Sequence, residues 1–162
     1  MAVRSAGILL YRRDPANGLE VWIAHMGGPF WERKPTHSWS IPKGEYAAGE
    51  DPLLAALREF TEEIGTPPPP VNYLPLGGFR QPSGKIITVF AAESDFQPER
   101  IVSNTFPLEW PKGSGNIQDF PEVDDARWVA EPDARIKLVK GQLPVLDALL
   151  KHLGEPASGP TD

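Results

Sequence analysis

The apolar positions of this chain fall in short runs separated by segments rich in glycine and proline. Apolar runs of roughly four to eight residues between turn signals are typical of β-strands. We predict strands or short extended segments over residues 3–12, 19–26, 39–42, 73–80, 85–94 and 126–129. The segments 27–37 and 104–121 are predicted to be long loops, and one or two helices are expected within residues 132–153. This order predicts a mixed α/β domain.

One further helix is predicted over residues 51–64. Asp51 can accept a hydrogen bond as the N-cap, Pro52 suits the first helical position, and Gly65 suits a helix end. At about 100° per residue, the apolar side chains form a stripe that we expect to pack on the sheet. The stripe consists of Leu53, Leu57, Phe60 and Ile64. A different face gathers Glu59, Glu62 and Glu63.

These three carboxylates repel one another, at a cost of roughly a few tenths of a kcal/mol per like-charged pair. The simplest interpretation of such a face is a solvated acidic surface. A divalent cation among the carboxylates would relieve the repulsion, and oxygen ligands select a hard cation such as magnesium or manganese. Helical geometry alone leaves both interpretations open.

Composition narrows the class of protein. Apolar residues make up 40% of the 162 positions and charged residues 23%, which is typical of one globular domain. The absence of cysteine excludes disulfides, thiolate zinc sites and a cysteine nucleophile. A formal net charge of −6 argues against non-specific nucleic-acid binding, which needs a basic surface.

The same data predict where the domain lies and in which compartment. No apolar run reaches membrane-spanning length, and the first residues lack the layout of a signal peptide, so a cytoplasmic protein is expected. We predict one domain over residues 1–153. Residues 154–162 have no apolar anchor and are expected to form a flexible tail.

The segment from Gly44 to Thr66, GEYAAGEDPLLAALREFTEEIGT, resembles the Nudix box, a loop-helix-loop signature. The positions that match are Gly44, Glu50, Arg58, Glu59, Phe60, Glu62, Glu63 and Gly65. Thr66 departs from the signature, since the family prefers an aliphatic residue there. We expect this change to affect packing more than chemistry.

The resemblance extends beyond the box. Trp39-Ser40-Ile41-Pro42-Lys43-Gly44 is similar to the segment before the box in several Nudix branches, and Arg4-Ser5-Ala6-Gly7 to the first strand of diadenosine-polyphosphate hydrolases. The whole chain resembles a bacterial group of predicted nucleoside-triphosphate pyrophosphohydrolases. The resemblance implies the Nudix α/β/α sandwich, with a mixed sheet between helices.

It also implies roles for the residues of the box. The carboxylates that match Glu59, Glu62 and Glu63 bind metals in the family, with magnesium expected and manganese as the alternative. One of these glutamates, or another nearby, activates the water, and Glu59 is favoured here. Arg58 is expected to pair with a glutamate and orient it.

Other roles are implied around the box. Gly44 is expected to allow a tight turn, which lets the carbonyl of Lys43 reach a metal. Glu50 is expected to brace the loop or to serve a second site. Many members take one more carboxylate from a distant loop, and Glu122 is the candidate here, ahead of Glu109.

Contacts with the substrate are the least determined part. Arg4, Lys43 and Gly44 are expected at the substrate by their matched positions. Several aromatic side chains lie in segments predicted to surround the cleft, and one or two could stack on a base, although core burial is the commoner fate of an aromatic. They are Phe30, Trp31, Phe106, Trp110 and Phe120.

The expected function is magnesium-dependent hydrolysis of a diphosphate linkage in a nucleoside diphosphate joined to another moiety. A nucleoside triphosphate or a (di)nucleoside polyphosphate is the expected substrate. The expected partner is thus a small nucleotide-like molecule, with neither nucleic acid nor membrane, and a homodimer is left open. The alternative is a catalytically silent Nudix-fold module that binds nucleotides or regulates, although such modules usually lose the glutamates that this chain keeps.

Overall fold

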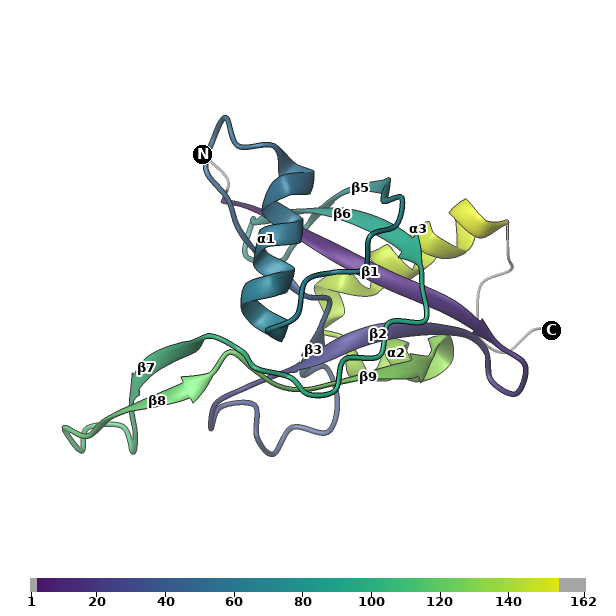
Figure 1. The fold of residues 1–162 in the computed structure, drawn as a ribbon. Helices are drawn as coiled ribbons and strands as arrows, with labels where there is room; N and C mark the ends of the chain where they lie inside the picture. The colour runs from purple at the N-terminus through teal and green to yellow at the C-terminus, as the bar shows by residue number, and fades with distance from the viewer. Residues whose placement is uncertain (1–2, 155–162) are drawn as a thin grey trace.

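The structure is a computed structural model that describes residues 3–154, and it has a central sheet with helices on both faces (Figure 1). The strands of the sheet are β1 (Arg4–Asp14), β2 (Gly18–Met26), β3 (Trp39–Ser40), β4 (Lys43–Glu45), β5 (Leu74–Arg80), β6 (Ile86–Glu93) and β9 (Val123–Ala130). Strand β1 pairs parallel with β6 and antiparallel with β2 and β4. Strand β5 pairs antiparallel with β6, and β3 and β9 pair antiparallel with β2. The predicted mixed sheet is confirmed.

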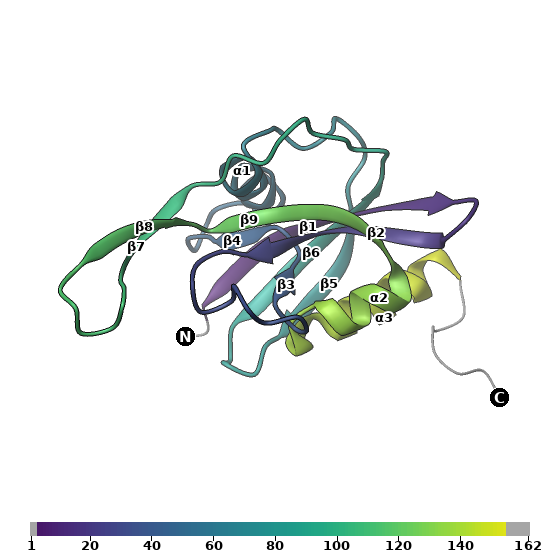
Figure 2. The same ribbon diagram turned by 90° about the horizontal axis from the view of Figure 1, so that it is seen from below.

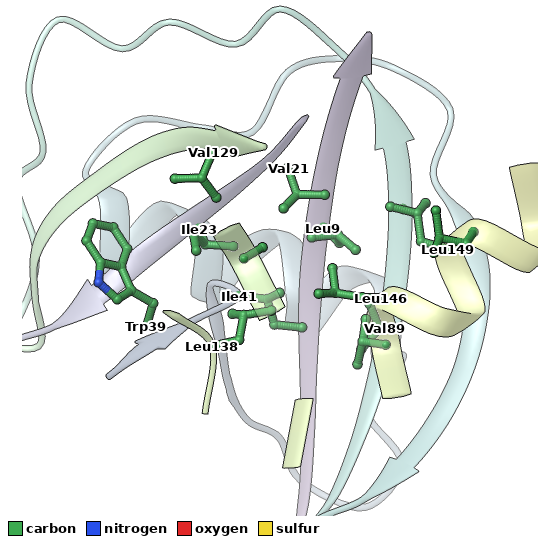
Figure 3. Close-up of a cluster of buried hydrophobic side chains, with 14 of the residues drawn as sticks. Leu9, Val21, Ile23, Trp39, Ile41, Val89, Val129, Leu138, Leu146 and Leu149 are labelled. Atoms are coloured by element: carbon green, nitrogen blue, oxygen red, sulfur yellow. The ribbon is translucent and has the colours of Figure 1, made fainter. Parts of the chain in front are cut away.

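Helices cover each face of this sheet, and alternation along β1 divides its side chains between two cores. Ala6, Ile8 and Leu10 contribute to the core beneath α1 (Pro52–Ile64). Leu9 points to the opposite core (Figure 3), where it lies among residues that include Leu146. That second face is covered by α2 (Glu131–Lys137), the 3-10 helix η1 (Lys140–Gln142) and α3 (Leu143–Leu153). The arrangement is the predicted α/β/α sandwich.

The termini of α1 agree with the sequence, whereas its buried stripe differs in part. The side chain of Asp51 accepts a hydrogen bond from the Leu54 amide at 3.0 Å, and Gly65 closes the helix with φ 86°. The fully buried residues of α1 are Ala55, Ala56, Phe60 and Ile64. Two residues of the predicted stripe, Leu53 and Leu57, are only partly buried, since two alanines let the helix approach the sheet along a shifted line.

The prediction of a structureless loop over residues 104–121 is wrong. β7 (Thr105–Glu109) and β8 (Ile117–Pro121) form a separate two-stranded antiparallel sheet. We call residues 105–121 the arm, because they project from the body of the molecule (Figures 1 and 2). Prolines and glycines in this segment conceal the alternation by which strands are recognised in a sequence. The two halves of the segment satisfy each other's backbone hydrogen bonds by pairing as β7 and β8.

The sequence did not predict β4, and β9 begins three residues before the predicted segment, while the other boundaries differ by one or two residues. Among residues 3–154, no helix is long and apolar enough to cross a membrane. Gly154, the first residue of the predicted tail, ends α3 with φ 71°, and residues 155–162 lie outside the described part of the chain.

Candidate active site

The site is built around a close contact between β4 and α1. A Cβ atom added to Gly44 would lie 2.1 Å from the Cδ and the Oε2 of Glu59, so the glutamate carboxylate occupies the space that any other residue would fill. The backbone of Gly44 is not in the left-handed region. Our explanation of this glycine by a tight turn is therefore corrected: the approach of Glu59 is what requires it.

Arg58 lies among the carboxylates of the box. It contacts the Oε2 of Glu50, lies 3.1 Å from the Oε1 of Glu59, and lies 4.0 Å from Glu62. Glu50 also accepts a hydrogen bond from the Ala47 amide at 3.4 Å, which ties the loop before α1 to the helix. Arg58 thus connects the loop before α1 to the carboxylates of the helix.

Glu63 lies one helical turn beyond Glu59, against the adjacent backbone position of β4. Its Oε1 accepts a hydrogen bond from the Lys43 amide at 3.1 Å. Burial raises the pKa of Glu63 to about 8, because desolvation of the charged form outweighs the hydrogen bond and the charge of Lys43. Without a cation, this carboxyl group is neutral over much of the physiological range.

Glu122 joins the site from the junction between β8 and β9, far along the chain. Its amide donates to the Asn104 carbonyl at 2.9 Å, and its carbonyl accepts from the Gly27 amide at 2.9 Å. Burial, and then the charge of Glu62, raises the pKa of Glu122, and the charge of Glu122 in turn raises the pKa of Glu63. The charges of these glutamates thus affect one another's pKa values, and the group consists of Glu59, Glu62, Glu63 and Glu122.

Two adjoining hollows surround these groups. The first, of about 240 Å³, is lined by Glu63, Glu122, Lys43 and the aromatic side chains of Trp31 and Phe106. The second, of about 500 Å³, shares Lys43 and Trp31 with the first and continues to the turn between β5 and β6 and to η1. Together they form a cleft with carboxylates at one end and an apolar, lysine-bearing wall at the other.

The structure does not bring every predicted substrate residue to this cleft. Arg4 lines a different depression, with Tyr46 and Glu50 on the α1 side of the sheet, since alternation along β1 turns Ser5 rather than Arg4 toward the cleft. Lys43 and Gly44 do lie at the site, the former on the walls of both hollows.

The cleft also contains residues that the sequence did not indicate. Lys140 and the fully buried Gln142 come from η1, which meets the turn before β6 only in the folded chain. Gln142 accepts from the Ile41 amide at 2.9 Å and donates to the Ser40 hydroxyl at 2.9 Å. No local pattern indicates this role, because the partners of Gln142 lie about a hundred positions away in the sequence.

The donor set suits a hard divalent cation. It consists of carboxylate oxygens whose charged forms are disfavoured by desolvation and mutual repulsion, and a cation would relieve both. Within residues 3–154, no three acidic or histidine side chains already lie close enough to hold one ion. Glu59 instead faces Arg58, so binding requires the carboxylates to turn toward one another.

We expect the metal-free protein to lose stability as pH rises from about 4.5 to about 8. The unfolded Glu63 ionises near 4.5 whereas the folded group ionises near 8, so the stability present below pH 4.5 is lost across this window and stays low above it. The difference has a ceiling of roughly 5 kcal/mol. Thermal unfolding in EDTA should show the fall, and Mg²⁺ should reduce it. A Glu63→Gln variant with the same pH dependence as the wild type would contradict this assignment.

Comparison with known sequences agrees with this geometry. Residues 1–149 match the family model of the NUDIX domain. An RNA pyrophosphohydrolase of Francisella philomiragia is 46% identical over 135 residues, which cover 71% of this chain and 77% of that protein. A nucleoside triphosphate pyrophosphatase/Nudix hydrolase fusion protein of Bifidobacterium longum is 36% identical over 140 residues, which cover 72% of this chain but only 28% of the fusion.

Solved structures show the same fold. An Ap4A hydrolase of C. elegans, in a binary complex, superposes with a TM-score of 0.63 at 19% identity, covering 93% of this chain and 98% of that one. The NUDIX domain of Shewanella oneidensis NrtR, complexed with ADP ribose, gives 0.61 at 17% identity, covering 94% and 89%. The family and the fold predicted from the sequence are confirmed. The chain therefore belongs to the NUDIX domain family, whose relatives named here include enzymes that hydrolyse pyrophosphate bonds.

Proposed function

We propose that this chain is a magnesium-dependent hydrolase, with manganese as the alternative metal, that cleaves a diphosphate linkage in a nucleotide. The substrate is a nucleoside triphosphate or a (di)nucleoside polyphosphate. The observation that supports this proposal most strongly is the meeting of Glu63 and Glu122 in one hollow beside the Glu59–Gly44 contact. We propose that the protein acts in the cytoplasm, as a monomer or a homodimer.

Each residue of the site has a proposed role. Glu59, Glu62 and Glu63 would hold the metal, with Glu122 and the Lys43 carbonyl as further ligands. Bound there, the ion would supply a water of lowered pKa and neutralise charge on the phosphate oxygens.

Glu59 is the proposed base. Arg58 donates to its Oε1 at 3.1 Å, and its Oε2 lies over Gly44, so these two neighbours keep the carboxylate beside β4, from where it would turn toward a bound cation. Burial raises the pKa of Glu59, which favours its accepting the proton of the attacking water. The water oxygen bonds to one phosphorus while the bridging oxygen leaves with the other phosphate.

Lys43 is proposed to meet the substrate phosphates. It lines both hollows, and its charge lowers the pKa of both Glu63 and Glu122, which supports a role beside the carboxylates. A lysine there can neutralise a phosphate without competing for the metal.

The test is Mg²⁺-dependent turnover of a panel that contains ATP, diadenosine tetraphosphate, ADP-ribose, a nucleotide sugar and an RNA carrying a 5′-triphosphate. The RNA is included because a relative that is 46% identical is an RNA pyrophosphohydrolase. Turnover of one class that disappears with EDTA and in Glu63→Gln supports the proposal and names the substrate. Tight binding without turnover would instead favour the silent nucleotide-binding module.

Glu122→Gln is expected to lower kcat by about 10- to 100-fold, because it removes one charge from the metal site while keeping the shape of the side chain. Asp119→Asn is the matched control, since Asp119 is an exposed acid three residues before Glu122 and lines neither hollow. Steady-state kinetics on the substrate found above would measure both. Equal activities of the two variants would remove Glu122 from the metal site.

A further inference from the structure

We propose that one face of the arm is a platform for the part of the substrate beyond the cleaved diphosphate, so that a two-ended nucleotide such as a dinucleoside polyphosphate is preferred to a mononucleotide. This inference rests on the proposed function, because it places the cleaved linkage at Glu63 and Glu122. The arm lies outside the Nudix box, and none of the proposed metal ligands belongs to it.

The two faces of the arm differ: one gathers the aromatic side chains, and the other carries the two carboxylates. Alternation along β7 puts Phe106 and Leu108 on the same side. Trp110 follows the last residue of β7, and its amide donates to the Asn116 carbonyl at 2.9 Å, so the antiparallel pairing continues and the same alternation assigns Trp110 to this side. Phe106 stands opposite Phe120, with ring centroids 6.2 Å apart, so Phe120 belongs to this face as well. The acidic residues Glu109 and Asp119 alternate to the other face. An anionic substrate therefore meets no carboxylate of the arm on the apolar side.

This apolar face is continuous with the active-site cleft. Phe106 lines the same hollow as Glu63 and Glu122. Its ring packs against Gly28, where an added Cβ would lie 2.8 Å from the ring. Trp110 lies four residues further along the chain, one residue past the end of β7, which is about 13 Å from Phe106 if the backbone stays extended at ~3.3 Å per residue. The platform therefore starts at the hollow and leads away from the body (Figure 2).

The second hollow adjoins the first one on a side that the arm does not reach. It is bounded by Trp31, Pro82 and Lys140 and shares no residue with the arm. A mononucleotide with its base in this second hollow and its diphosphate at the glutamates has nothing left to reach the arm. A substrate with a second base would have a group that reaches the arm. Aromatic side chains can bind any base by stacking.

The backbone holds Trp110 in place although its side chain is exposed. The Trp110 amide donates to the Asn116 carbonyl at 2.9 Å, and its carbonyl accepts from the Gln118 side chain at 2.9 Å. The carboxylate of Glu109 accepts from the Gly113 amide at 2.7 Å and from the Gly115 amide at 3.2 Å, which fixes the turn. An indole that is 41% exposed on a fixed backbone can bind a flat ligand without first becoming ordered.

The experiment compares diadenosine tetraphosphate with ATP in the full chain, by the ratio of their kcat/KM values. Trp110→Ala should lower this ratio by about 5- to 100-fold, the range that loss of one stacked base predicts. Trp110→Phe should retain most of it. Ile117→Ala is the matched control, because Ile117 is 65% exposed on the opposite face of the arm and should leave the ratio unchanged.

A ratio in Trp110→Ala that equals that of the wild type would overturn the proposal. So would a dimer in sedimentation that Trp110→Ala converts to a monomer, because a second copy of the chain would then cover this face. Should the wild type hydrolyse neither compound, the substrate class named under the proposed function fails, and the same ratio is taken from dissociation constants measured by calorimetry. Failure of the wild type to bind diadenosine tetraphosphate more tightly than ATP would then contradict the platform.

Discussion

Glu63→Gln is expected to reduce kcat by on the order of 10²- to 10⁴-fold while the protein stays folded. The substitution preserves the shape of the side chain, and the amide oxygen can still accept the hydrogen bond from the Lys43 amide. It removes the negative charge that would bind a cation. Burial raises the pKa of Glu63, so this charge is the one that most needs a cation beside it. Rates at saturating Mg²⁺ and substrate would measure the loss.

Glu45→Gln is the control for this result. Glu45 is an exposed acid of β4, the strand whose Lys43 amide contacts Glu63. Its carboxylate lies 3.8 Å from Lys85 rather than at the proposed metal site. It should keep wild-type turnover. If Glu63→Gln and Glu45→Gln were equally active, the metal site would have to be sought elsewhere.

The second large effect is expected from Gly44→Ala, which should lower kcat by about 100-fold or more and raise the Mg²⁺ concentration needed for activity. The new methyl group would lie 2.1 Å from the Glu59 carboxylate, so the side chain must leave its position beside β4. A displacement of this size at a positioned catalytic group typically costs on the order of 10²-fold in rate. Mg²⁺ titrations of activity would separate the two parameters.

Gly78→Ala provides the comparison for a strand glycine. A Cβ at Gly78 would meet only the Ile86 side chain, at 3.5 Å, which is an ordinary contact. Thermal unfolding of both variants would show whether Gly44→Ala merely unfolds the protein. An active, folded Gly44→Ala enzyme would show that Glu59 is not required in the position described here.

The sequence predicted the parts of the site that lie within one element. Asp51 and Gly65 delimit α1 by local backbone requirements, and the box glutamates share a helix face by geometry alone. These features depend on neighbours a few residues away, and the structure reproduces them. The role of Gly44 was different, because the contact with Glu59 depends on how β4 and α1 pack.

The features that the sequence did not predict depend on distant pairing. The arm exists because residues 105–109 pair with residues 117–121, which compensates for the prolines within them. Arg4 lies away from the cleft because the register of β1 decides which residues face it, and a matched position does not specify the face. Lys140 and Gln142 reach the cleft only through the packing of η1 against the turn between β5 and β6.

The separateness of the arm has a consequence for how such enzymes diverge. Its strands hydrogen-bond to each other in a sheet of their own, so the register of the central sheet does not depend on the arm's length or surface. Beyond Phe106, which packs against Gly28, changes in the arm are thus largely decoupled from the stability of the central sheet, and its length can change without displacing the glutamates. A lineage could in this way acquire a new substrate range by remodelling an appendage rather than its catalytic centre.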